Sequence, residues 1–100
     1  MADPATEPPS LNRLWARVHG TVQGVGFRWY VLHRARTLEL TGWVRNRPDG
    51  SVEVLAEGPR HTLAPLLEAL RKGPAGARVT RVEESWSEVS PQHDGFEILT

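Results

Sequence analysis

The sequence predicts a single α+β domain, a two-layer sandwich in which an antiparallel sheet carries two helices on one face. Apolar residues alternate with polar ones in several short stretches, as in strands with one buried face. They recur every three or four residues in two other stretches, as in amphipathic helices. Glycine and proline separate these stretches. The resulting order, βαββαβ plus a short terminal strand, suits this architecture, and a chain of 100 residues is long enough for one such core.

The N-terminal segment differs in composition from the rest of the chain. Residues 1–10 contain three prolines and no large apolar residue after Met1. Such a segment cannot bury enough apolar surface to offset the entropy lost on ordering. We therefore expect residues 1–12 to be a disordered tail and residues 13–100 to form the domain.

The first half of the domain is predicted to contain three strands and one helix. Leu14 to His19 alternates between apolar and polar residues and predicts a strand. Phe27 to Leu38 has apolar residues at helical spacing and predicts a helix. Thr41 to Arg47 and Ser51 to Glu57 alternate again, and the turn-forming residues Pro48 to Gly50 join them. These two segments are predicted to form a hairpin.

The second helix follows this hairpin and raises a question about where it begins. Gly73 and Pro74 mark its end. Pro65 would remove an interior hydrogen bond if the helix began near Pro59, whereas with Thr62 as N-cap it would fall in the first turn. We expect a late or irregular start. The apolar stripe of the helix consists of Leu63, Leu66, Leu67 and Leu70.

Two further strands are predicted near the C-terminus. Ala77 to Trp86 has the apolar positions Val79, Val82 and Trp86, whose spacing is not a strict alternation and therefore predicts a bulge or bend. Phe96 and Ile98 alternate in a short last strand.

A glycine-rich run joins the first strand to the first helix, with the sequence G-T-V-Q-G-V-G-F-R from Gly20 to Arg28. Glycines allow a tight turn that exposes backbone N–H groups, and the helix that follows has a partly positive N-terminus with unpaired donors. Arg28 adds a planar set of charged donors. Such a turn favours a small tetrahedral anion such as phosphate. It fits neither the P-loop pattern, because no lysine follows Gly26, nor the dinucleotide pattern, because Trp29 occupies the third-glycine position.

Two runs carry a resemblance to a known family. The run from Gly20 to Arg28 resembles the first signature of the acylphosphatases. The run G-W-V-R-N-R-P-D-G-S-V from Gly42 to Val52 resembles their second. Both occur in the family's order, and the similarity extends from about Leu14 to the end of the chain. The resemblance implies a ferredoxin-like fold and hydrolysis of the carboxyl–phosphate bond of acyl phosphates without a metal or other cofactor.

The resemblance also assigns roles to individual residues. The positions of Arg28 and Asn46 match the family's phosphate-binding arginine and water-positioning asparagine. The substrate is then a small acyl phosphate, and inorganic phosphate is both product and inhibitor. The loop residues expected to bind phosphate together with Arg28 are Gln23, Gly24, Val25, Gly26 and Phe27.

The predicted topology independently brings the two proposed catalytic residues to one end of the sheet. The first two strands should run parallel with the third between them, so their C-terminal ends lie at the same edge. The first strand carries the glycine turn there, and the second carries Asn46 on the same face as Val44. Arg28 begins the helix that covers this face. A charged phosphate ligand and a neutral residue able to hold water suit phosphoryl transfer, which depends on positioning and charge stabilisation.

The composition of the chain limits the other functions that it could have. The chain has no cysteine and a formal net charge of zero, which excludes disulfides and cysteine nucleophiles and gives no broad basic surface. No signal peptide or membrane span is evident, so we expect a cytoplasmic monomer. Arg47 either steers anions or is a solvated turn charge, and Asp49 and Glu53 are expected to be turn and surface residues. We expect no metal site, because the histidines do not pair at ligand spacing: His19, His33, His61 and His93.

Two rival functions remain at this stage. An aromatic and basic sheet face could stack nucleotide bases, although the third strand is acidic and lacks the aromatic residues of RNA-recognition modules. The residues of that face are Trp15, Arg17, His19, Trp43 and Arg45. The domain also resembles the acylphosphatase-like region of larger carbamoyl-transfer maturation proteins, but its end at Thr100 favours a free-standing enzyme. The sequence does not identify the physiological acyl phosphate.

Overall fold

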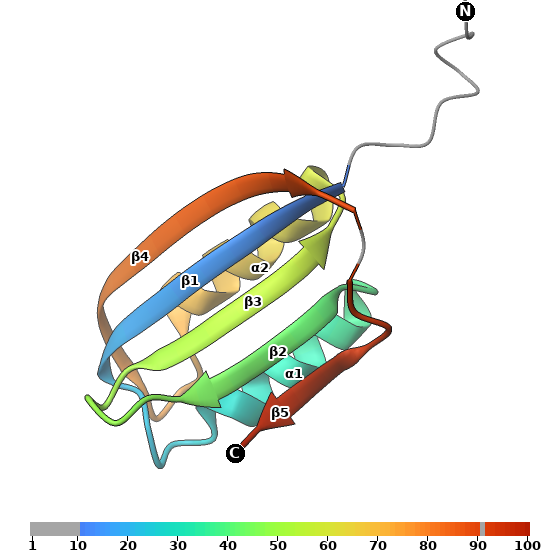
Figure 1. Ribbon diagram of the computed structural model, residues 1–100. Helices are drawn as coiled ribbons and strands as arrows, with labels where there is room; N and C mark the ends of the chain where they lie inside the picture. Colours follow the sequence, from blue (N-terminus) through green and yellow to red (C-terminus); the bar gives the residue numbers. More distant parts are fainter. Residues whose placement is uncertain (1–10, 91) are drawn as a thin grey trace, which may run out of the picture.

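The computed structural model describes residues 11–90 and 92–100, so the expected tail over residues 1–10 lies outside the described residues. The described part contains the predicted elements in the predicted order (Figure 1). The domain starts slightly earlier than expected, because the first strand already includes Leu11 and Asn12. The elements are β1 (Leu11–Thr21), α1 (Phe27–Thr37), β2 (Thr41–Asn46), β3 (Val52–Gly58), α2 (Arg60–Lys72), β4 (Arg78–Val89) and β5 (Phe96–Leu99).

The five strands form one sheet in the order β4-β1-β3-β2-β5. The neighbours β4-β1-β3-β2 are all antiparallel, and β1 and β2 run in the same direction with β3 between them, as predicted. The terminal strand β5 instead pairs parallel with β2, with Val44 opposite Ile98, so the complete sheet is mixed. The chain crosses one end of the sheet after β4 and returns along the opposite edge, which gives β5 the direction of β2 (Figure 1).

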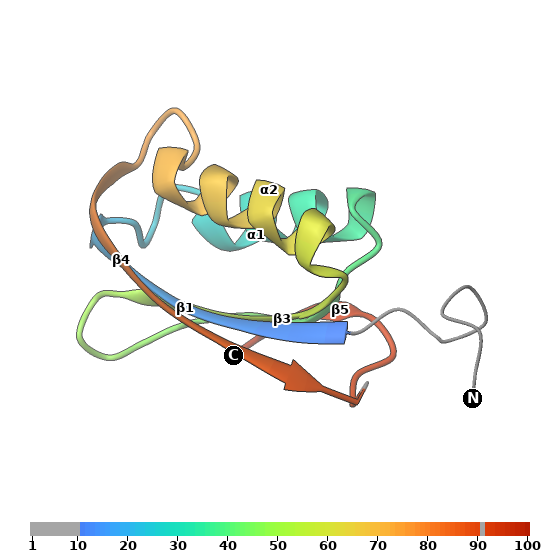
Figure 2. The ribbon, with the colours of Figure 1, turned by 90° about the horizontal axis from the view of Figure 1, so that it is seen from above.

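Both helices cover the same face of the sheet, and the core lies between the two layers (Figure 2). Alternate residues of the strands point into this core, as the period of two requires. The predicted leucine stripe of α2 is buried throughout. The buried apolar residues of the sheet are Leu14, Ala16, Val18, Val44, Val52, Val54, Ala56 and Phe96, and those of α1 are Phe27, Val31, Leu32 and Ala35.

The predicted late start of the second helix was wrong. Helix α2 begins at Arg60, with Pro59 as N-cap, and contains Pro65 in its interior. The hydroxyl and backbone N–H of Thr62 donate to the Pro59 carbonyl at 2.7 and 3.0 Å, so Thr62 stabilises the first turn from within the helix. Pro65 removes the N–H that would bind the His61 carbonyl. Both residues are exposed, so water can satisfy that carbonyl.

The predicted irregularity of β4 is confirmed and lies beside the glycine-rich loop. His19 pairs with Arg81 while Gly20 pairs with Val79, so one residue of β4 bulges between them. Gly20 has φ 127°, and a Cβ there would lie 2.0 Å from the Arg78 carbonyl oxygen. Only glycine therefore fits where β1 leaves the sheet and the loop begins.

Candidate active site

The loop between β1 and α1 has the geometry of an anion-binding turn. Gly24 and Gly26 have φ values of 74° and 78°, in the left-handed region that favours glycine. Helix α1 begins directly after Gly26, without a side-chain cap and without an acidic residue in its first turn. Its first N–H groups therefore remain available as donors at the positive end of the helix dipole. This arrangement favours a bound anion at the helix N-terminus.

The Gln23 side chain holds the loop against the neighbouring hairpin. Its Nε2 donates to the backbone carbonyls of Arg47 and Ser51, at 2.8 and 2.9 Å. Both amide hydrogens are thus committed to the β2–β3 connection. Gln23 therefore fixes the loop's position, and its side chain is not directed at a ligand.

A small cavity of about 110 Å³ lies at this loop. It brings together Arg28 and Asn46, as the topology predicted. Gln23 and Val25 were also predicted to bind phosphate but do not line the cavity, and Val25 packs against the core instead. The residues that line the cavity are Val22, Gly24, Gly26, Phe27, Arg28, Trp29 and Asn46.

Asn46 is the last residue of β2 and pairs with Val52 across the sheet. Its Oδ1 is buried and has no hydrogen-bond partner in the part of the chain that the structure describes. Buried acceptors normally have a partner, because an unsatisfied one costs about 1–3 kcal/mol. Asn46 also lines the small cavity, and its side-chain amide, which can both donate and accept hydrogen bonds, is suited to hold a small molecule such as water.

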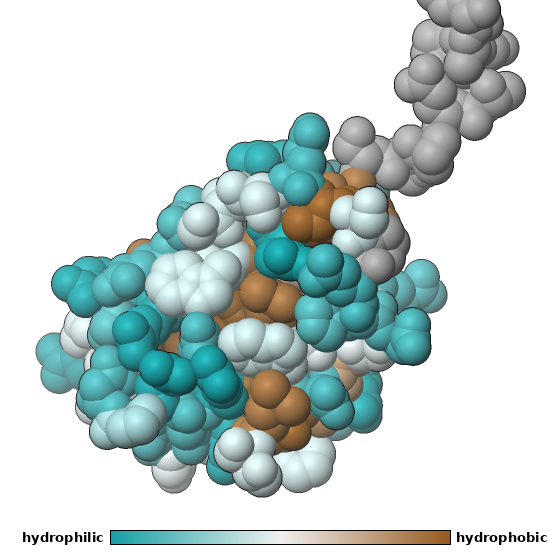
Figure 3. All heavy atoms as spheres, viewed as in Figure 1, coloured by the Kyte–Doolittle hydropathy of each residue, from teal (hydrophilic) through white to brown (hydrophobic). Residues whose placement is uncertain are grey.

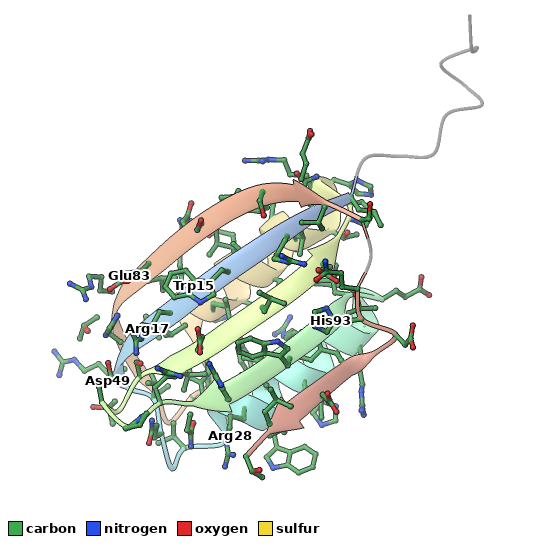
Figure 4. The ribbon with its side chains drawn as sticks, in the orientation of Figure 1. Trp15, Arg17, Arg28, Asp49, Glu83 and His93 are labelled. Carbon is green, nitrogen blue, oxygen red and sulfur yellow. The ribbon has the colours of Figure 1, made fainter. Side chains whose placement is uncertain are left out.

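Arg28 lies in the first turn of α1, at the end of the sheet where the loop leaves it (Figure 4). It forms no ion pair with any described residue, unlike Arg13, Arg17 and Arg45 of the sheet. Its charge is therefore not compensated by a carboxylate within the described chain. A free guanidinium beside exposed helix N–H groups suits bidentate binding of phosphate oxygens.

The sheet face opposite the helices uses its arginines differently (Figure 4). The Trp15 indole donates to Glu53 at 2.7 Å, and the Arg45 guanidinium lies 4.9 Å from the Trp43 ring centre. The space-filling view shows hydrophilic, intermediate and hydrophobic residues mixed over this face (Figure 3). Each of three arginines pairs with a carboxylate there: Arg13 with Glu57, Arg17 with Asp49 and Arg45 with Glu53. These cations are thus engaged within the fold, which favours sheet stabilisation over base stacking.

Two carboxylates near the arginines of this face, Glu53 and Asp49, have lowered pKa values. Burial alone would raise the pKa of Glu53, but hydrogen bonds from Trp15 and Arg45 and the charges of Arg45 and Arg47 outweigh it. Hydrogen bonds from the Ser51 side chain and backbone lower the pKa of Asp49. Both groups are therefore held ionised by structural contacts. That neither is an acid or base of the reaction stays a prediction.

No group of three or more histidine and acidic side chains capable of holding a metal ion occurs within residues 11–90 and 92–100. No helix in the same ranges is long and apolar enough to cross a membrane.

Known proteins match both the sequence and the fold of the chain. A family model described as Acylphosphatase matches residues 14–98. An acylphosphatase of Salinibacter ruber is 50% identical over 92 residues, which cover 92% of this chain and 97% of that protein. The chain belongs to the acylphosphatase family. An acylphosphatase of Nocardia farcinica is 54% identical over 85 residues, which cover 85% of each chain.

A solved structure extends this agreement to three dimensions. The crystal structure of an acylphosphatase from Bacillus subtilis superposes with a TM-score of 0.86 and 40% identity, covering 89% of this chain and 99% of that one. The fold is accordingly the ferredoxin-like sandwich expected from the sequence. As a member of this family, the protein is a hydrolase whose substrates are small acyl phosphates.

Proposed function

We propose that Arg28 and the first N–H groups of α1 bind the phosphoryl group of an acyl phosphate, while Asn46 holds the attacking water. The observation that carries this proposal is the cavity where Arg28, Gly24, Gly26 and Asn46 meet beside the uncapped helix N-terminus. The transferring phosphoryl group carries negative charge in the transition state, and fixed hydrogen-bond donors stabilise that charge. The Arg28 guanidinium and the backbone amides at the start of α1 supply such donors without rearrangement.

In the proposed reaction, the side-chain amide of Asn46 hydrogen-bonds a water and directs its oxygen toward phosphorus. A new phosphorus–oxygen bond forms as the bond to the acyl oxygen breaks, and that bond's electron pair leaves with the carboxylate. Both protons of the water end on the inorganic phosphate. Asn46 removes no proton, since a carboxylate is a good leaving group and the reaction needs no strong base.

The same geometry supports three subsidiary proposals. Turnover needs no metal, because Arg28 and the helix N-terminus already provide positive charge at the phosphoryl site. Inorganic phosphate inhibits competitively, because it presents the same oxygens to Arg28. The active unit is a monomer, since one chain supplies every residue lining the cavity.

The test is phosphate release from acetyl phosphate in the presence of excess chelator, with a phosphomonoester as the control substrate. We expect chelator-resistant hydrolysis of acetyl phosphate alone and competitive inhibition by added phosphate. Loss of turnover in chelator that returns with an added divalent cation would refute the metal-free mechanism. Light scattering on the active sample reports whether the monomer is the working species.

A further inference from the structure

A second hollow, of about 410 Å³, continues from the catalytic cavity along helix α1 toward β5. Arg28 and Trp29 line both the hollow and the catalytic cavity, so the hollow and the cavity lie next to each other. The residues that line this hollow are Arg28, Trp29, Leu32, Arg36, Glu97 and Ile98.

Apolar and charged side chains both line this hollow. The Trp29 side chain is 62% exposed, and within the described residues it is the large hydrophobic residue left open to solvent. The aliphatic lining residues Leu32 and Ile98 are buried and half-buried. The charged lining residues are Arg28, Glu97 and Arg36, which donates to the Phe96 carbonyl at 3.2 Å. An exposed tryptophan next to aliphatic side chains is a surface suited to a flat apolar group.

The acyl group of a bound substrate must lie close to the phosphoryl site. In an acyl phosphate one bridging oxygen joins the acyl carbon to phosphorus, so the acyl group of a substrate bound there lies beside Arg28. The hollow that shares Arg28 and Trp29 with the cavity is a space next to that position.

We propose that Trp29, Leu32 and Ile98 form the acyl-group subsite, and that it selects acyl phosphates with an aromatic or other apolar acyl group. This proposal rests on the phosphoryl site proposed above. The Trp29 ring covers one face of the acyl group, and the two aliphatic side chains contact its edge.

The experiment compares benzoyl phosphate with acetyl phosphate as substrates. The quantity measured is the ratio of their kcat/KM values in each variant, divided by the ratio in the unmodified protein. Trp29→Ala should lower this ratio by about tenfold, the size of one lost aromatic contact. Trp29→Phe keeps an aromatic ring, so its ratio should stay close to that of the unmodified protein.

The matched control is His33→Ala. His33 lies one turn further along α1, with its ring centre 6.3 Å from that of Trp29, but it does not line the hollow. His33→Ala should leave the ratio unchanged. Both residues are exposed, so both variants should fold, which thermal unfolding verifies.

Two results would overturn the acyl subsite: an unchanged ratio in Trp29→Ala, or an equal fall in His33→Ala. The second result would attribute the effect to the helix as a whole. Failure of the phosphoryl site is detected separately, because it appears as acetyl phosphate hydrolysis that does not depend on Arg28. The ratio is normalised to acetyl phosphate, so the two failures are distinguishable.

Discussion

The arginines paired on the open face of the sheet and Arg28 at the N-terminus of α1 lie in contrasting environments. On the open face of the sheet, Arg13 and Arg45 bind glutamates at 2.6 and 2.8 Å, and the carboxylates they contact are held ionised. At the N-terminus of α1, Arg28 has no carboxylate partner among the described residues, and the nearby Asn46 Oδ1 is unpartnered as well. Paired charges stabilise the fold, whereas unpaired groups around a cavity are free to bind a ligand. The contrast predicts opposite effects of mutation in the two regions.

The largest effect is expected from Arg28→Ala. Loss of a guanidinium that stabilises a transferring phosphoryl group lowers rates by about 10³–10⁵. Arg28→Lys should recover only part of this loss, because an ammonium group lacks the planar pair of donors. The measurements are kcat/KM with acetyl phosphate and the inhibition constant of inorganic phosphate.

The matched control for Arg28→Lys is Arg45→Lys. Arg45 precedes Asn46 in the sequence but lies on the opposite sheet face, where it contacts Glu53 and the Trp43 ring. This variant should retain its turnover number and lose at most about 1 kcal/mol of stability, as for other partly exposed ion pairs. If Arg28→Lys kept both turnover and phosphate inhibition, Arg28 would have no place in the phosphoryl site.

Asn46→Ala is expected to give the next largest effect. Removal of one preorganised hydrogen-bonding group lowers the rate of the chemical step by a factor of about 10²–10³, which corresponds to about 3–4 kcal/mol of added barrier. The inhibition constant of phosphate should change little, because Arg28 and the loop amides remain. Single-turnover kinetics and thermal unfolding on the same sample check both statements.

Two further variants sharpen the role of Asn46. Asn46→Asp keeps the shape but adds a negative charge beside the anion cavity, so it should weaken phosphate binding as well as the rate. Asn12→Ala, at the opposite end of the sheet, should leave turnover unchanged. If Asn46 served stability instead, its Ala variant would unfold at lower temperature while the folded protein kept its rate.

Most of the fold was predictable because periods of two and of three to four are local properties of the sequence. The leucine stripe was sufficient to predict helix α2, and the irregular spacing of Val79 and Val82 was sufficient to predict the bulge in β4. The start of α2 was predicted wrongly, because Pro65 was treated as costly wherever it fell inside a helix. The cost depends on which side the freed carbonyl faces, and here that side is solvent.

The candidate site was predictable only in part, for a different physical reason. Two sequence signatures and strand parity placed Arg28 and Asn46 together. The side-chain contacts of Gln23, however, depend on where the β2–β3 turn lies in space, and no local pattern specifies that position. Trp29 was also missed as a cavity residue. Trp29 directly follows Arg28 in the sequence and lies outside the apolar stripe of its helix. These two features could have indicated that Trp29 lines the cavity.

A smaller effect, on stability alone, is expected from Glu57→Gln on the open sheet face. Glu57 is 2% exposed and accepts hydrogen bonds from Arg13, from the backbone of Gln92 and from His93. The amide loses the charge and part of this bonding, which should cost about 1–3 kcal/mol of unfolding free energy. The turnover number of the folded protein should be unchanged. Glu88→Gln, at an exposed position in β4, is the control and should have no effect.

The last prediction uses pH to test whether charge is the cause of that stability difference. Burial opposes ionisation of Glu57, but hydrogen bonds from His93, Arg13 and Gln92 outweigh it and hold its pKa below the ordinary value of 4.5. A carboxyl group with a lower pKa in the folded state stabilises the protein above its unfolded pKa. That contribution is lost as the pH falls below 4.5 through the folded value.

The stability gap between the unmodified protein and Glu57→Gln should therefore be constant near neutral pH and shrink as the pH falls below 4.5. Thermal unfolding of both proteins from neutral pH to about pH 3 measures this gap, a range that spans the carboxyl titrations. Because the glutamine cannot titrate, the narrowing isolates the Glu57 charge from the other carboxylates that both proteins share. A gap that stayed constant through the whole range would mean that Glu57 stabilises the sheet by its shape and neutral hydrogen bonds. The charge pairing inferred for the open face would then not extend to its most buried carboxylate.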